Sequence, residues 1–196
     1  MSTDYIDLFL RESIESIKKI NQKQIEQLII TINKVRSQKG RIFFLGVGGS
    51  AGNASHAVND FRKLANIECY APTDNVSELT ARTNDEGWET TFINWLKVSN
   101  LNSKDMIFVF SVGGGSIEKK ISMNIVKAVE YAALIGSEIG GVLGRDGGYT
   151  FTKSKNCVLI PVTNPDKVTP ISEAFQALVW HLIISSPDIQ KNSTKW

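Results

Sequence analysis

The sequence predicts an α/β protein with a three-layer, doubly wound parallel sheet and additional helices at its N-terminus. Two short, continuous apolar runs, at residues 42–45 and 107–110, are each followed at once by a glycine-rich turn. Such a run is typical of a strand that is buried on both faces of a sheet. A helix-periodic stretch follows each turn, and the repeated order of strand, glycine turn and helix indicates parallel strands.

The remaining elements follow from apolar periodicity. The first forty residues predict two helices, with Gly40 as the stop signal of the second. Both helices have wide apolar faces, which suit either the sheet or another subunit, and the sequence leaves this choice open. The polar tail, residues 187–196, is expected to fray. Further helices are expected at about 50–64, 117–134 and 171–185, and further strands at 139–143 and 157–160.

Composition narrows the class of protein. No repeat, low-complexity segment or linker divides residues 1–196, so a single domain is expected. The 22 basic and 20 acidic residues are scattered, which argues against a nucleic-acid partner. We see no secretory signal and no apolar stretch of the roughly 18 residues that a membrane span needs. Cys69 and Cys157 have no CxxC spacing, so we expect buried, reduced thiols and a cytoplasmic location.

Glycine and serine are concentrated in two strand-to-helix turns, residues 46–50 and 111–116. In a doubly wound sheet, ligands bind beyond the carboxyl ends of the strands, where helix N-termini present free backbone N–H groups. Glycine lets the backbone approach a ligand, and serine hydroxyls donate hydrogen bonds to phosphate oxygens. These turns therefore predict a phosphate site that needs no cation. The alternative that both are merely tight turns stays open.

Nucleotide-binding motifs fit these turns poorly. The P-loop pattern G-x-x-x-x-G-K-[ST] is absent from the sequence. The first turn approaches the dinucleotide pattern G-x-G-x-x-G/A, with Ala51 in the last place. That pattern requires an acidic residue at the end of a second strand about twenty residues later. After Cys69 and Tyr70 the first acidic residue is Asp74, so we expect no nucleotide cofactor.

Six short motifs follow one another along the chain, and their order and spacing are more specific than any one of them. With these motifs the chain resembles the sugar isomerase (SIS) domain family, and within it the phosphoheptose isomerases, over nearly its whole length. The motifs are Gly46-Val47-Gly48-Gly49-Ser50, His56-Ala57-Val58-Asn59-Asp60, Asn84-Asp85-Glu86-Gly87, Ser111-Val112-Gly113-Gly114-Gly115-Ser116, Gly144-Arg145-Asp146-Gly147-Gly148, and Glu173 with His181.

The resemblance implies the SIS fold and a cytoplasmic homotetramer. It implies an enzyme that isomerises sedoheptulose 7-phosphate to an aldoheptose 7-phosphate through an enediol, supplying sugars for lipopolysaccharide, capsule or glycoproteins. Asp60 would be the base and His181 the acid, which suits a reaction that moves a proton between adjacent carbons. The turn at 111–116 would bind the phosphate. The implied substrate-binding residues are Val47, Gly48, Gly49, Ser50, Asn84, Asp85, Ser111, Val112, Gly113, Ser116 and Glu173.

The resemblance also implies zinc, one ion per chain, at the positions of His56, Asp60, Glu173 and His181. From the residues alone, His56 and Asp60 are i and i+4 on one predicted helix and share a face, although such pairs are more often surface contacts. Glu173 and His181 are separated by about 12 Å of helical rise. One ion or one proton relay does not span that distance easily, which favours a site at a subunit interface.

Several positions depart from the family pattern. Val47 replaces an asparagine, and Val112 and Gly113 remove two hydroxyls from the phosphate turn, at about 1 kcal/mol for each lost hydrogen bond. Asp60 replaces a glutamate and reaches about 1.5 Å less far, which weakens a positioned base. Glu173 replaces a glutamine and adds a negative charge.

These departures leave two other functions open. One is a non-catalytic SIS module that binds a phosphosugar or a protein partner, as related replication-initiation regulators do. The other is an etherase or a different lyase on the same fold, although such members are usually longer than this chain.

Overall fold

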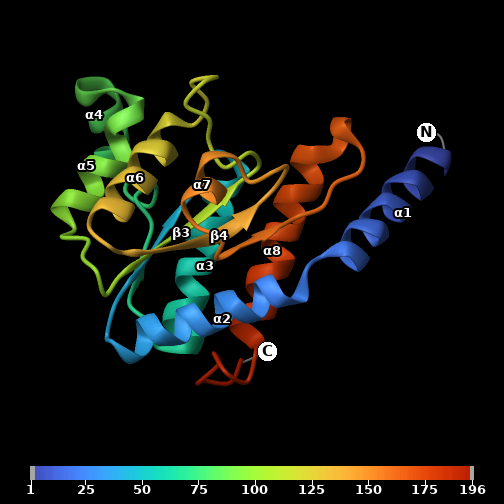
Figure 1. The fold of residues 1–196 in the computed structure, drawn as a ribbon, viewed down its shortest axis with the longest axis horizontal. Helices are drawn as coiled ribbons and strands as arrows, with labels where there is room; N and C mark the ends of the chain where they lie inside the picture. The colour runs from blue at the N-terminus through green and yellow to red at the C-terminus, as the bar shows by residue number, and fades with distance from the viewer. Residues whose placement is uncertain (1–2, 195–196) are drawn as a thin grey trace.

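The computed structural model describes residues 3–194 and contains a five-stranded, all-parallel sheet in the order β2-β1-β3-β4-β5 (Figure 1). The strands are β1 (Ile42–Leu45), β2 (Cys69–Tyr70), β3 (Met106–Ser111), β4 (Glu138–Leu143) and β5 (Cys157–Leu159). The α-helices are α1 (Thr3–Lys19), α2 (Gln22–Ser37), α3 (Gly49–Ala65), α4 (Val76–Glu86), α5 (Thr91–Val98), α6 (Met123–Leu134), α7 (Gly148–Lys153) and α8 (Val168–Ser185).

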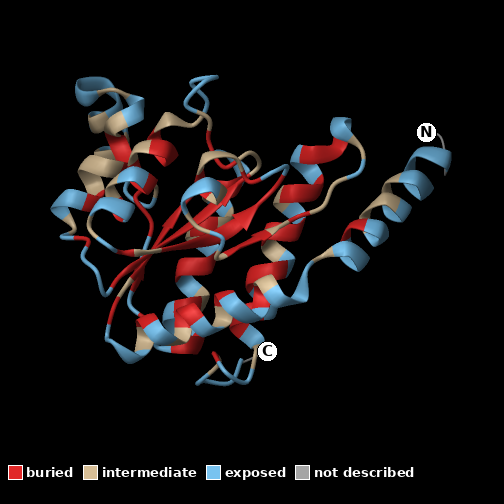
Figure 2. Cartoon of the chain, in the orientation of Figure 1, coloured by how far each residue is buried: buried red, intermediate tan, exposed pale blue. Residues whose placement is uncertain are grey.

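The sheet is the middle of three layers. Side chains alternate across the strands, so Phe44 and Phe108 belong to one apolar core and Phe43 and Ile107 to the other. Helices α2, α3 and α8 cover the first face, and α5 and α6 cover the second. Figure 2 shows the buried strands between these helices. The α/β fold with a doubly wound parallel sheet is confirmed.

The chain order creates a crevice at the carboxyl end of the sheet. From β1 the chain adds β2 on one side, then returns to place β3, β4 and β5 on the other. Connections leave β1 and β3 toward opposite faces, which is the arrangement that opens a ligand crevice between two such strands. The turns after β1, β3 and β4 therefore share one edge of the sheet.

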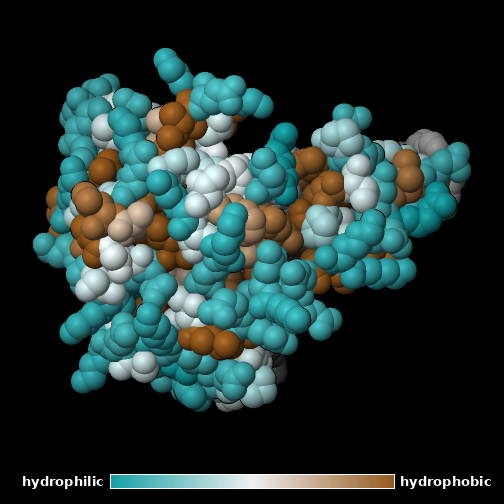
Figure 3. Space-filling view, viewed as in Figure 1, coloured by the Kyte–Doolittle hydropathy of each residue, from teal (hydrophilic) through white to brown (hydrophobic). Residues whose placement is uncertain are grey.

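The two N-terminal helices take different positions. Helix α2 lies on the sheet and buries Ile25, Leu28 and Ile32 in the core. Helix α1 extends away from the body (Figure 1), and hydrophobic side chains are visible along it in Figure 3. Its exposed apolar residues are Tyr5, Ile6, Leu8, Leu10, Ile14 and Ile17. Helix α2 thus covers the sheet, one of the two alternatives that the sequence left open, and α1 does not.

Gly40 helps to close the end of the second helix, as expected, because its N–H donates to the carbonyl of Val35 at 2.9 Å, but its expected place as the left-handed residue is wrong. Helix α2 ends at Ser37, and the residue with left-handed backbone after it is Lys39, with φ of 56°. Gly40 is needed for a different reason, because a Cβ there would collide with the carbonyl oxygen of Lys104.

Two predicted segment ends are also wrong. The helix expected from residue 117 begins at Met123, because Ser116 and Ile121 pair through two backbone hydrogen bonds and close a turn before it. The tail is docked where it was expected to fray: Ile189 is fully buried, and the N–H groups of Lys191 and Asn192 donate to the carbonyl of Leu64. The prediction for residues 195–196 lies outside the described residues.

Both cysteines are free and buried, as expected. Burial raises the pKa of the Cys69 thiol and raises the pKa of Cys157 to about 12, so both stay protonated near neutral pH. Among residues 3–194, none of the helices combines the length and the apolar character that a membrane span requires.

Candidate active site

The turns after β1 and β3 open into one cavity of about 1120 Å³ at the carboxyl end of the sheet. The turn after β4 and helix α7 supply another wall. Both glycine-serine turns that the sequence singled out therefore contribute to a single site. The predicted residues that line the cavity are Val47, Ser50, Ser111, Val112, Gly113 and Ser116.

The first turn is shaped by close packing. Gly48 has a left-handed φ of 62°, which glycine adopts without strain. A Cβ on Gly46 would collide with the carbonyl of Ser50, so the chain can fold back tightly here before α3 begins. The carboxylate of Glu173, from α8, lies against Gly49 at the start of α3. Glu173 is thus placed beside this turn.

The second turn is fixed by hydrogen bonds to α7. The hydroxyl oxygen of Ser111 accepts from the N–H of Gly114 at 2.9 Å and ties the turn to the end of β3. The N–H of Tyr149 donates to the carbonyl of Gly115 at 2.8 Å, and the N–H and hydroxyl of Thr150 donate to that of Gly114 at 3.0 and 2.8 Å. These bonds commit the two carbonyls to donors at the start of α7.

The motif at residues 144–148 was recognised in the sequence, but no chemical role was predicted for it. The structure shows that its glycines pack on the second turn, since a Cβ on Gly148 would collide with the carbonyls of Gly113 and Gly115. The motif also places Arg145 in the cavity wall. Charge in the cavity was missed as well: besides Arg145, the charged lining residues are Glu118, Lys119, Asp146 and Lys155.

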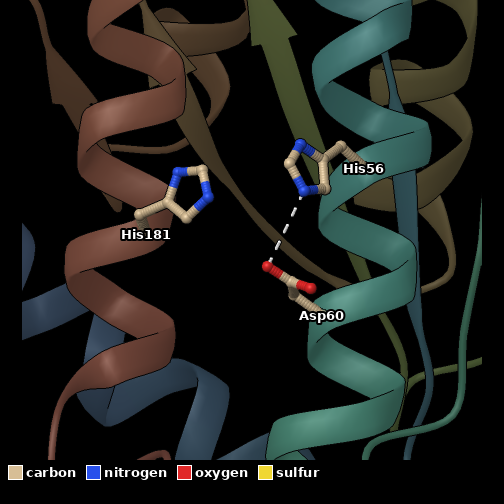
Figure 4. Close-up of side chains that lie close together, drawn as sticks. All are labelled: His56, Asp60 and His181. Carbon is tan, nitrogen blue, oxygen red and sulfur yellow. Dashed lines mark ion pairs between the residues drawn. The ribbon is translucent and has the colours of Figure 1, made fainter. Parts of the chain in front are cut away.

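His56, Asp60 and His181 form a cluster between α3 and α8 (Figure 4). Each offers one ligand atom, and these atoms lie within 4.8 Å of one another. His56 Nε2 is 3.9 Å from Asp60 Oδ2. Nδ1 of His181 is 2.7 Å from the carbonyl oxygen of Ala177, so Nδ1 carries the proton and Nε2 is left to bind a ligand. We call these three residues the triad.

Trp180 orients both histidines and was not singled out from the sequence. Its ring is fully buried, stacks on the His181 ring at 3.5 Å between centroids, and meets the His56 ring edge-on at 4.7 Å. The two histidine rings are 5.4 Å apart, also edge-on. A buried indole in contact with both rings restricts their rotamers and keeps the ligand atoms close.

Among the described residues, five predicted site residues lie apart from both the cavity lining and the triad: Gly48, Gly49, Glu173, Asn84 and Asp85. Glu173 is beside the first turn, and the triad does not include it, in keeping with its eight-residue separation from His181 on α8. Asn84 and Asp85 are exposed near the end of α4, where the amide of Asn84 donates to the Asp85 carboxylate at 2.7 Å. In the described chain, neither of these two residues lines the cavity.

The cavity and the triad lie at different heights along α3. Ser50, in the first turn of α3, lines the cavity. Asp60 follows ten residues later, which is about 15 Å along the helix. His56 and His181 are exposed, and Asp60 is half-buried. The triad therefore faces outward, below the edge of the sheet at which the cavity opens.

The donor atoms of the triad fit a zinc ion. Two imidazole nitrogens and one carboxylate oxygen are the ligand types of catalytic zinc sites, which keep a fourth position open. Bonds of about 2.0–2.1 Å in tetrahedral geometry would place the ligand atoms about 3.4 Å apart. The observed spacing is wider than this, and small rotamer adjustments of the exposed histidines would close it.

Comparison with known proteins gives the family of the chain. The SIS domain profile matches residues 4–144, more than half of the chain. The phosphoheptose isomerase of a Nitratiruptor species is 31% identical over 166 residues, 82% of each chain. That of Helicobacter pylori (strain P12) is 27% identical over 179 residues, 89% of this chain and 85% of the relative. The solved phosphoheptose isomerase of Neisseria gonorrhoeae matches with a TM-score of 0.78 at 24% identity, covering 92% of this chain and 95% of that one. The chain therefore belongs to the SIS domain family, in the group of the phosphoheptose isomerases.

Proposed function

We propose that this protein is a phosphosugar isomerase that interconverts sedoheptulose 7-phosphate, or a related ketose phosphate, and the corresponding aldose phosphate. The observation that carries the proposal is the single cavity into which the turns after β1 and β3 both open. The membership of the family supports the same activity. Backbone N–H groups and the hydroxyls of Ser111 and Ser116 would hold the phosphate, with the sugar directed toward Val47 and Ser50.

The chemistry would be carried by the triad. Asp60 would take the proton from one carbon of the substrate, and His181 would serve the neighbouring oxygens through Nε2. A zinc ion held by His56, Asp60 and His181 would occupy Nε2 of His181, so it would polarise the substrate oxygens in place of that imidazole's proton and leave the second carboxylate oxygen of Asp60 as the base. Glu173, beside the first turn, would contact the sugar, and Asn84 and Asp85 would reach it only from a neighbouring chain or after movement of α4.

We further propose that the protein is a homo-oligomer, in keeping with a tetramer. The apolar side chains exposed along α1, together with Leu178 and Leu182 exposed on α8, suit burial against other copies. The outward-facing triad would then meet the cavity of a second copy. Light scattering after gel filtration would test this: we expect an oligomer for the wild type and a smaller species for Ile14→Glu.

We also propose that residues 1–196 act as one SIS domain in the cytoplasm and that the product enters the synthesis of a surface polysaccharide such as lipopolysaccharide or capsule. Two buried, unpaired cysteines suit a reducing compartment. A deletion strain that lacks heptose-containing surface polysaccharide, and regains it when the gene is restored, would support this role.

The test of the isomerase is direct. We would incubate the folded, purified oligomer with sedoheptulose 7-phosphate, with zinc added or removed, and follow the aldose product by chromatography and mass spectrometry. The expected result is turnover that is lost in Asp60→Ala. Absence of turnover on this and on shorter ketose phosphates would overturn the proposal.

A non-catalytic phosphosugar-binding module is the second candidate. It is favoured by the separation of cavity and triad within one chain and by the short Asp60 side chain. Calorimetry distinguishes the two, because binding of sedoheptulose 7-phosphate without turnover supports the module. Absence of any sugar-phosphate binding would instead point to a protein partner.

A further inference from the structure

The strongest feature of the cavity that the proposed function leaves unused is Arg145. It is the second residue of the turn after β4, it is exposed, and it lines the cavity beside the phosphate turn. Within the described residues, its guanidinium makes no ion pair with an acidic side chain. Asp146, next to it, is occupied in accepting from the N–H of Gly148 at 3.0 Å. Arg145 therefore offers an uncommitted positive charge to the cavity.

The side chain of Arg145 lies over the bare backbone of the phosphate turn. A Cβ placed on Gly113 would be 3.8 Å from Cδ of Arg145, which is ordinary van der Waals contact. Gly113 is one of the two positions at which the turn lacks the hydroxyls of the family pattern. The arginine stem therefore lies within van der Waals reach of position 113 and passes alongside the phosphate turn.

The backbone of Arg145 decides which replacement suits a test. Its φ is 51°, in the left-handed region that glycine and asparagine adopt more easily than other residues. Gly144, Gly147 and Gly148 in the same turn are glycines for packing reasons, since a Cβ on each would meet neighbouring atoms at close range. Lys39 and Lys120 have the same left-handed backbone, so this conformation does not by itself assign a role; it makes asparagine a well-tolerated replacement at position 145.

We propose that Arg145 is a phosphate ligand beside a turn that lacks side-chain hydroxyls at Val112 and Gly113. A guanidinium binds a phosphate monoester through two parallel hydrogen bonds, and a charged bond is about twice as strong as a neutral one. With Arg145 as a ligand, the site would select a dianionic phosphate by its charge. Hydroxyls and backbone N–H groups without the arginine would select it by hydrogen bonding alone. This inference rests on the proposed function only in taking the ligand to be a phosphate ester.

The experiment measures binding of inorganic phosphate to the intact oligomer by calorimetry, independently of turnover. Arg145→Asn should weaken phosphate binding by about 10- to 100-fold while leaving the melting temperature unchanged or higher, because asparagine tolerates the left-handed backbone. Arg145→Lys should give an intermediate loss, since it keeps the charge and loses the two-pronged geometry. With sedoheptulose 7-phosphate, KM should rise in Arg145→Asn and kcat should change little.

Two matched variants serve as controls. Lys155→Gln removes the same charge from the same cavity, where the Lys155 ammonium lies 3.9 Å from the centre of the Phe151 ring. Lys63→Gln removes it from the exposed end of α3. We expect less than a threefold change in phosphate affinity for both. An equal loss in Lys155→Gln and Arg145→Asn would overturn the proposal, because it would indicate general cavity charge.

The phosphate-ligand role of Arg145 and the isomerase activity can fail independently, and the measurements tell the two apart. Unchanged phosphate affinity in Arg145→Asn, or no phosphate binding by the wild type, overturns the role of Arg145 even if the enzyme turns over. A selective loss of phosphate affinity in a protein that isomerises no ketose phosphate supports Arg145 as a ligand and removes only the catalytic activity.

Discussion

The phosphate turn and the triad are built in opposite ways. The turn consists largely of backbone held by hydrogen bonds to α7, and a buried hydroxyl, that of Ser111, closes it. The triad consists of three side chains from two helices, and both histidines are exposed. Folding fixes a backbone site completely, whereas an exposed side-chain site is completed by its ligand. We therefore expect substitutions in the turn to lower stability together with phosphate affinity, and substitutions in the triad to lower turnover or metal affinity alone.

The largest expected effect is on turnover in the triad. Asp60→Ala and His181→Ala should each lower kcat by about 10²- to 10⁴-fold, the usual contribution of a positioned base or acid. The free energy of unfolding should change by no more than about 1 kcal/mol, because His181 is exposed apart from its stacking on Trp180 and Asp60 is only half-buried. Steady-state kinetics and thermal melts measure the two quantities. Asp60→Glu is the matched variant and should keep or raise kcat, and a large loss of stability in either alanine variant would contradict the comparison.

The next effect is on metal affinity and tests which residues bind the ion. His56→Ala should weaken zinc binding by more than about 100-fold, because removing a ligand costs more than removing its hydrogen-bond partner. Glu173→Gln should change the affinity by less than about threefold, since the triad excludes Glu173. Competition with a coloured chelator gives both values. Equal losses in the two variants would mean that α8 rearranges to bring Glu173 to the ion.

The sequence predicted the elements of the site better than their assembly. The apolar runs at 42–45 and 107–110 could only be strands buried on both faces, so the doubly wound sheet followed from them. The pairing of His56 with Asp60 followed from helical spacing. The contact between the turns at 111–116 and 144–148, by contrast, is made between main-chain atoms of distant glycines, and no local pattern reports it. The same holds for Arg145, whose side chain lies beside Gly113 although 32 residues separate the two in the sequence.

The next prediction tests the packing of the phosphate turn, residues 111–116. Gly114→Ala should cost about 3 kcal/mol of stability and abolish phosphate binding, because Gly114 has a φ of 66° and a Cβ there would collide with the carbonyl of Gly147. Gly52→Ala is the control, since Gly52 lies in α3 with open space around it. It should stabilise the protein by about 0.5–1 kcal/mol. Urea unfolding measures both, and similar values would show that the turn is more plastic than its contacts indicate.

The smallest effects separate two serines of the same turn. Ser111 and Ser116 are both proposed phosphate ligands, but the oxygen of Ser111 also accepts from the buried N–H of Gly114, and that of Ser116 accepts at 3.2 Å from the exposed N–H of Lys119. Ser111→Ala should therefore cost about 1 kcal/mol of stability, because it leaves a buried donor unpaired. Ser116→Ala should cost less than about 0.5 kcal/mol, since water replaces the hydroxyl. Both should weaken phosphate binding by a similar factor, measured by calorimetry beside urea unfolding. If stability fell equally in the two variants, the turn would be held by both of its ends, and Ser116 would belong to the framework as well as to the ligand site.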